Sequence, residues 1–204
     1  MKIKADEASG RATWEIYLVG HSMGTIVIDQ MLRETLELKL ELPIKAIVYM
    51  AAAASVREVI DSVVPYLQSN VNAHFYNLML HHVADEREPY IRPFGIPVDP
   101  TPRGSLLVLI DNFLSKPLSY LDRTAGRYDN FLPAVHDVPG NLWPRVHIKA
   151  FSVGDDKDTR DANPQRHGEF SERFKFWMPD CWSPEPAMKR SGRDPRDCMY
   201  DPAK

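Results

Sequence analysis

Apolar and polar positions along the chain follow two kinds of pattern. Short, nearly continuous apolar runs predict buried strands, because a parallel sheet covered on both faces needs apolar side chains on both sides of each strand. These runs span residues 15–19, 45–50, 74–80 and 146–153. Stretches in which apolar residues recur every three or four positions predict helices with one buried face. They span residues 25–40, 55–68, 105–115 and 171–180.

This alternation predicts an α/β fold, with a mostly parallel sheet of about four strands flanked by helices. Pro65 is expected to end or kink the second helix, because proline removes a helical hydrogen bond. Ser105 is expected to cap the third helix. The buried side of that helix would carry Leu106, Leu107, Leu109, Ile110, Phe113 and Leu114.

The pentapeptide Gly20-His21-Ser22-Met23-Gly24 joins the first predicted strand to the first predicted helix. A G-x-S-x-G motif between a strand and a helix is typical of a nucleophile elbow, a sharp turn that holds a serine in strained backbone geometry. Flanking glycines let strand and helix approach closely. The Ser22 hydroxyl would stand clear of the backbone, and the Met23 N–H would point to where an oxyanion forms. The alternative interpretation is a small-residue turn without chemistry.

The stretch EIYLVGHSMGTIVIDQ, residues 15–30, resembles the nucleophile region of the α/β-hydrolase superfamily, in its lipase and esterase branch. A second match is the strand 146–153, followed by a polar loop and then His167-Gly168-Glu169-Phe170. That superfamily keeps its catalytic histidine in a loop after the last strand, and serine precedes histidine along the chain. The resemblance covers about residues 14–180 and implies a C-terminal portion of that fold. It implies Ser22 as nucleophile, His167 as base and Met23 as an oxyanion donor.

The resemblance also implies a carboxylate that orients the histidine. In the superfamily's order this acid follows the strand before the histidine strand, which here is 74–80. Asp85 lies at the expected distance, and Glu86 is next to it. A rival is the acidic loop before His167, formed by Asp155, Asp156, Asp158 and Asp161. The order of preference is Asp85, then Glu86, then Asp156, and both groups can also be read as solvated charge.

The chain offers little support for a metal or a cofactor. His81 and His82 lie beside the presumed acid loop, but nothing else at ligand spacing supports a metal site there. No metal and no cofactor are therefore expected.

Composition narrows the class of protein further. The chain has 204 residues, of which 44% are hydrophobic, and a formal net charge of −3. This size suits one domain with a real core, and a nearly neutral charge gives no reason to expect nucleic acid or an anionic membrane as a partner. No apolar run is long enough to span a membrane. The only cysteines, Cys181 and Cys198, are expected not to staple the fold, so a reducing, cytoplasmic location is predicted.

The ends of the chain carry two further expectations. Residues 1–180 would form the α/β-hydrolase-like domain, and residues 181–204, which are rich in proline and poor in apolar side chains, would form a disordered tail. About fourteen residues precede the first strand, and none of them predicts a strand or an HG-type oxyanion loop. Compared with the superfamily, the N-terminal part of the fold and the second oxyanion donor would be missing. The edge of strand 15–19 would be unpaired and open to self-association.

These patterns together predict a serine hydrolase that acts on carboxylic esters, small or lipid-like, through a Ser-His-acid triad. Segments 91–98 and 105–115 and the aromatics near Trp143 are candidates for an acyl pocket. Two alternatives stay open. One is a truncated, weak or inactive hydrolase remnant that acts as a binding module. The other is a serine acyltransferase, because the same triad serves either acceptor.

Overall fold

The chain folds around one four-stranded sheet. The computed structural model describes residues 6, 9–10, 13–88, 103–154, 156–157, 160, 163–176, 178, 181 and 198. Its strands are β1 (Ile16–His21), β2 (Ile44–Met50), β3 (His74–Leu80) and β4 (Val146–Phe151), in that spatial order, with every neighbouring pair parallel. The predicted α/β class with a mostly parallel sheet of about four strands is confirmed.

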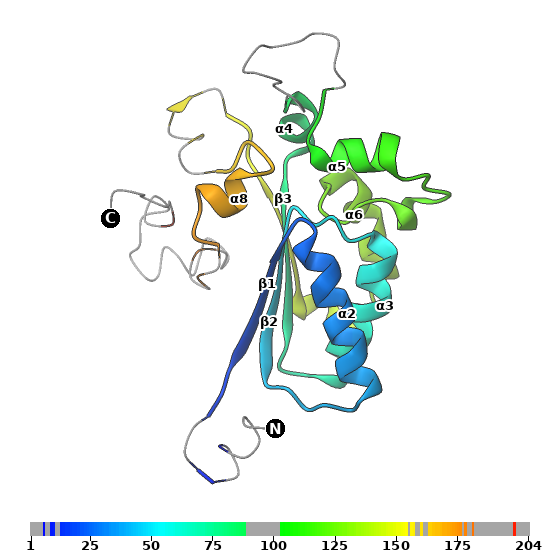
Figure 1. Cartoon of the computed structure of the whole chain (residues 1–204), viewed down its shortest axis with the longest axis vertical. Coiled ribbons are helices and arrows are strands. Elements are labelled where there is room, and N and C mark those ends of the chain that lie inside the picture. The colour runs from blue at the N-terminus through cyan, green and yellow to red at the C-terminus, as the bar shows by residue number, and fades with distance from the viewer. Residues whose placement is uncertain are drawn as a thin grey trace.

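Helices connect the strands and cover both faces of the sheet. The two long helices are α2 (Gly24–Glu37) and α3 (Val56–Ser69). The shorter elements are α4 (His82–Arg87), α5 (Leu106–Leu109), the π-helix η2 (Ile110–Leu114), η3 (Tyr120–Asp122), α6 (Tyr128–Ala134), η4 (Val135–Asp137), η5 (Gly140–Arg145) and α8 (Glu169–Glu172). Helices α2, α3 and α6 lie on one side of the sheet and α8 lies on the other (Figure 1).

Successive residues of β2 send their side chains into two separate cores. Ile47 and Tyr49 belong to the cluster on the side of α2 and α3. Val48 and Met50 belong to the cluster on the other side, which also holds Phe170 of α8. Because both faces of β2 are dry, its sequence is a continuous apolar run and not an alternating one.

Local signals set the ends of the two long helices. Ser55 and Glu58 form a capping box at the start of α3, in which each side chain accepts the other residue's backbone N–H. Helix α2 ends before Lys39, whose φ of 50° is left-handed and cannot continue an α-helix. Helix α3 runs through Pro65 to Ser69 and does not end at the proline, because its last turn is anchored by buried apolar side chains.

The segment 105–115 departs from the predicted amphipathic helix. Ser105 caps it as expected, but α5 gives way after one turn to the π-helix η2. A π-helical turn is wider than an α-helical one and shifts the later side chains around the axis. Asp111 is consequently buried, while Phe113 and Leu114 are 60% and 69% exposed. The prediction that Phe113 and Leu114 face the core is therefore wrong.

A buried arginine ties the segments that follow β3 together. Arg127 Nε donates to Asp85 Oδ2 at 2.7 Å, and its Nη1 donates to Asp111 Oδ2 at 3.2 Å. Asp111 also accepts the Asn130 Nδ2 and the Thr124 N–H, at 2.7 and 2.8 Å. Buried charges are tolerated when they are paired and hydrogen-bonded in this way. The cluster joins α4, η2 and α6 at one point.

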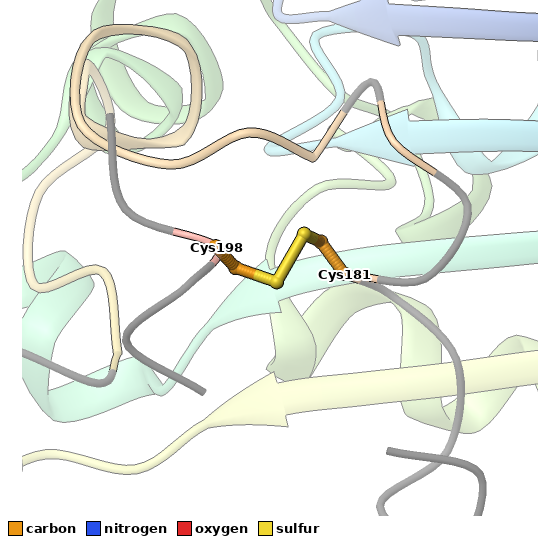
Figure 2. Close-up of a disulfide and its surroundings, with 2 residues drawn as sticks. All are labelled: Cys181 and Cys198. Carbon is orange, nitrogen blue, oxygen red and sulfur yellow. A yellow bond between two sulfur atoms is a disulfide. The ribbon is translucent and has the colours of Figure 1, made fainter. Parts of the chain in front are cut away.

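The two cysteines form a disulfide at the C-terminal end of the described chain (Figure 2). Their Cα atoms are 5.5 Å apart, and both residues are buried against the aromatic core on the α8 side. The expectation that these cysteines do not staple the chain is wrong, because packing brings two residues 17 positions apart into bonding range. The expected tail, 181–204, otherwise lies outside the described residues. A disulfide is typical of oxidising compartments, whereas the sequence analysis predicted a reducing, cytoplasmic location. That location stays a prediction.

Asp29 of α2 generates a prediction about stability and pH. Its side chain is buried, and its Oδ1 accepts hydrogen bonds from the hydroxyls of Tyr49 and Ser62. Burial raises the pKa of Asp29 from 3.8 to about 6, although those hydrogen bonds favour the charged form. Because folding raises this pKa, the protonated Asp29 carboxyl stabilises the folded state fully below pH 4, and this stabilisation is lost as the pH rises through 6. Asp29→Asn, which retains an acceptor oxygen, should therefore gain stability relative to the native chain by about 3 kcal/mol between pH 4 and pH 8.

Urea unfolding at a series of pH values measures this difference. The control is Asp61→Asn, because Asp61 lies exposed on the same helix as Ser62. The gain of Asp29→Asn between pH 4 and pH 8 should exceed the change seen in this control. If Asp29→Asn shows no gain over this range, the buried carboxyl is not the titrating group.

Candidate functional site

Ser22 occupies a sharp turn between β1 and α2. Its φ of 53° is in the left-handed region, which non-glycine residues rarely adopt. Backbone hydrogen bonds hold it there: the Ser22 N–H donates to Met50 O, and Ser22 O accepts the N–H of Ala53. Ser22 O also accepts the hydroxyl of Thr25. The expected strand, sharp turn and helix are present. Hydrogen bonds with β2, with the segment after it and with α2 hold the strained serine in place.

The two glycines of the motif do not have the same role. A Cβ on Gly20 would lie 2.8 Å from Ile28 Cδ1 and 3.1 Å from the backbone of Gly24. A Cβ on Gly24 would meet nothing within 4 Å. The close approach of strand and helix therefore requires glycine at position 20 only.

Met23 lies at the N-terminus of α2, where backbone N–H groups lack helical partners. Its N–H donates to no residue of the described chain. Its side chain is exposed. The geometry leaves this N–H free to bind a negatively charged oxygen beside Ser22.

His167 lies against the same end of β1 as Ser22. The ring nitrogen His21 Nε2 is 3.0 Å from His167 O, and the two imidazole centroids are 4.9 Å apart. His167 is buried, and neither ring nitrogen has a partner among the described residues. Burial, and then the nearby His21, lowers the pKa of His167 to about 4. The ring is consequently neutral at pH 7, which a general base requires.

Asp85 is not joined to His167. Its Oδ1 accepts the Ser105 hydroxyl, and its Oδ2 accepts Arg127 Nε at 2.7 Å. Burial raises the pKa of Asp85, while Ser105 and Arg127 oppose that shift. Since both carboxylate oxygens already accept from these partners, Asp85 holds the structure together where a triad acid was expected.

Of the other acids of the sequence analysis, the described ones, Glu86 and Asp156, make no hydrogen bond to the His167 ring. Glu86 is exposed on α4. Asp156 is exposed in the loop after β4, where its carbonyl oxygen accepts the Arg160 N–H. The remaining members of that cluster, Asp155, Asp158 and Asp161, lie outside the described residues, as does the candidate pocket segment 91–98.

Glu88 is the carboxylate that the structure brings to His167, and the sequence analysis missed it. Glu88 Oε2 accepts the backbone N–H of His167 at 2.7 Å. Burial, more than any other effect, raises the pKa of Glu88. No sequence signal pointed to this contact, because Glu88 follows the short helix α4 and His167 lies 79 positions further along the chain.

His81 has a local role. Its Nδ1 accepts the N–H of Val83 and so caps α4. His82 Nδ1 lies 3.9 Å from a carboxylate oxygen of Asp129. Within the described part of the chain, no three histidine, cysteine or acidic side chains gather as metal ligands do.

Comparisons with known proteins leave the family open. No family model, curated protein or solved structure matches this chain. The resemblance to the α/β-hydrolase superfamily therefore stays a prediction. In the described ranges, no helix has the length and apolar character needed to cross a membrane.

The two glycines of the turn generate a matched pair of variants. Gly20→Ala should lower the free energy of unfolding by about 1–3 kcal/mol, because the new methyl group overlaps Ile28 and the backbone of α2. Gly24→Ala should change it by less than about 1 kcal/mol, because its methyl group enters open space in a helix. Chemical denaturation of both purified variants measures the difference. Equal losses would mean that the strand and the helix do not approach as described.

Proposed function

We propose that this chain is a serine hydrolase that acts on carboxylic esters, with Ser22 as nucleophile and His167 as general base. The observation that carries the proposal is the left-handed Ser22 in a strand–turn–helix, beside a buried His167 ring. That ring packs against the preceding residue, His21, and has no hydrogen-bond partner in the described part of the chain. A strained serine presented at the end of a strand is the arrangement used by nucleophile elbows. A small or lipid-like ester is the proposed substrate.

The proposed reaction runs in two halves. The Ser22 oxygen attacks the ester carbonyl carbon while a ring nitrogen of His167 takes the serine proton. The Met23 N–H donates to the oxyanion of the tetrahedral intermediate. Collapse of that intermediate expels the alkoxide, which takes the proton from His167. In the second half, His167 removes a proton from water, the hydroxide attacks the acyl carbon, and Ser22 leaves with the proton returned.

Glu88 is the proposed acid partner of His167, in place of Asp85 and Glu86. It already accepts from the His167 peptide, whereas Asp85 accepts from Arg127 and Ser105. A carboxylate near the base stabilises the imidazolium that forms during attack and raises the basicity of the ring. Rotation of the Glu88 side chain or of the His167 ring is needed to form that contact.

Hydrolysis of p-nitrophenyl esters with short and long acyl chains tests the proposal. Ser22→Ala should abolish turnover, with a loss of about 1000-fold or more, because the nucleophile is gone. His167→Gln should cause a loss of similar size. Turnover that survives Ser22→Ala would contradict the proposal, as would a folded, monodisperse native sample without turnover.

The acid is tested with a matched pair of isosteric variants. Glu88→Gln should lower kcat by about 100-fold or more and shift the pH profile, because the charge that supports the imidazolium is lost. Asp85→Asn should mainly lower thermal stability, because it unbalances the buried ion cluster around Arg127. The reverse pattern would restore Asp85 as the acid. Adding an alcohol acceptor and measuring the ester formed distinguishes a serine acyltransferase from a hydrolase.

A second candidate function, a binding module, is favoured by one side of the molecule. Within the described sheet, β1 is an edge strand. The Ser22 N–H points to β2, and the backbone groups of successive strand residues point alternately to opposite sides. The N–H and C=O of Val19, three positions earlier, therefore point away from the sheet. Asp29 lies on the side of α2 that contacts α3. On the opposite side of α2, Val27 and Met31 are 61% and 45% exposed. A free strand edge beside an exposed apolar helix side favours pairing with another chain.

Sedimentation of the purified chain over a range of concentrations tests self-association through this side. Val19→Pro removes an outward N–H without breaking a bond to β2, so it should lower the associated fraction. Val27→Glu should do the same, because it places a charge in the apolar contact. The control is Val71→Glu, at a residue that is 73% exposed elsewhere. A native chain that is monomeric at every concentration, or equal effects of Val27→Glu and Val71→Glu, would contradict self-association through this side.

A further inference from the structure

An open cavity of about 190 Å³ lies beside the histidine loop, at the carboxyl ends of β3 and β4. Its polar lining comes from Arg87, Glu88, Arg160, Gln165 and Arg166. Open parallel sheets commonly bind ligands at this end of the strands. Since one water molecule occupies roughly 30 Å³ of liquid, the cavity has room for a small polyatomic ion with several waters.

The charge of this lining is predominantly positive. Arg160 and Arg166 line the cavity together with one acidic residue, Glu88, which already accepts the His167 N–H. Within the described residues, Arg160 makes no ion pair, and the side chain of Arg166 has only its electrostatic interaction with Glu88. Like charges gathered around a cavity repel one another, and an anion bound between them relieves that repulsion.

Hydrogen bonds hold the walls of the cavity in place. Gln165 Nε2 donates to Ser152 O at 3.0 Å and to Asn163 O at 3.1 Å, which joins the end of β4 to the histidine loop. The Gln165 N–H donates to Glu169 Oε2 at 2.7 Å. The backbone that carries Arg166 is therefore fixed before any ligand binds, which lowers the entropic cost of binding.

We propose that this cavity is a binding site for a small oxyanion, such as a phosphate, sulfate or carboxylate group, held by the guanidinium groups of Arg160 and Arg166. Planar guanidinium groups bind such anions with paired, charge-assisted hydrogen bonds. The oxyanion is either a free ion or the charged end of a substrate.

The cavity is joined to the candidate active site through the peptide of His167. Glu88 lines the cavity and accepts the His167 N–H, and Arg166 precedes His167 in the chain. An anion between the arginines draws Arg166 away from Glu88 and so changes the electrostatic environment of the loop that carries the base.

Calorimetric titration of the full chain with inorganic phosphate at low ionic strength tests the site. The native chain should bind phosphate, and the double variant Arg160→Gln/Arg166→Gln should bind it at least about tenfold more weakly. The control is Lys39→Gln/Lys116→Gln, which removes the same charge from two exposed positions elsewhere. Circular dichroism confirms that each variant is folded. The proposal is overturned if the native chain does not bind phosphate, if the arginine variant binds it equally well, or if the lysine variant loses as much.

A second measurement distinguishes the two sources of the anion, and it rests on the proposed esterase function. The kcat/KM of p-nitrophenyl hemisuccinate is divided by that of p-nitrophenyl butyrate, which has the same number of acyl carbons. If the site holds the charged end of the substrate, this ratio should fall at least about tenfold in the double arginine variant. If phosphate binding is lost while the ratio is unchanged, the site holds a free anion. A chain that hydrolyses neither ester defeats the esterase proposal and leaves the phosphate result standing.

Discussion

The left-handed backbone of Ser22 is the constraint on which the candidate site depends. A non-glycine residue in this region is unfavourable by about 1–3 kcal/mol, so the surrounding structure must enforce it. Here the enforcement is mutual: Met50 O accepts from Ser22, and Ala53 and Thr25 donate to Ser22 O. The hydroxyl of Thr25 also accepts the Ala54 N–H, which closes the network between the turn and the segment after β2. A network whose hydrogen bonds are all formed restricts the position of the serine more than a surface loop would.

The same segment after β2, residues 51–54, also contacts β3 and the segment that carries Arg127. Ala51 has a φ of 44°, and its N–H donates to Leu78 O of β3. Gly126 packs so closely over this bend that a Cβ would lie 2.1 Å from Ala52 N. The next residue, Arg127, reaches the two buried carboxylates of Asp85 and Asp111. Direct contacts therefore connect the Ser22 turn, the segment after β2 and the ion cluster around Arg127.

Two carboxylates at this end of the sheet have different partners. Asp85 and Glu88 are three residues apart, the first buried and the second partly buried. Asp85 neutralises Arg127, whereas Glu88 reaches the histidine loop and the arginine-lined cavity. A buried positive charge attracts the nearer acid and leaves the other to interact with the site. Which acid has which role depends on the position of Arg127, which is 42 residues further along the chain.

The sequence by itself determined the elements, because strand and helix periods and the G-x-S-x-G turn are local properties. Apolar runs predicted all four strands, and the serine turn follows from Gly20, which packing against Ile28 requires. Only the tertiary structure decided which side chains meet. The ion pair of the buried Asp111 with Arg127, the disulfide and the contact between Glu88 and His167 all join residues that no local pattern links. Such contacts are set by how the loops pack at the end of the sheet, and that packing depends on the whole chain at once.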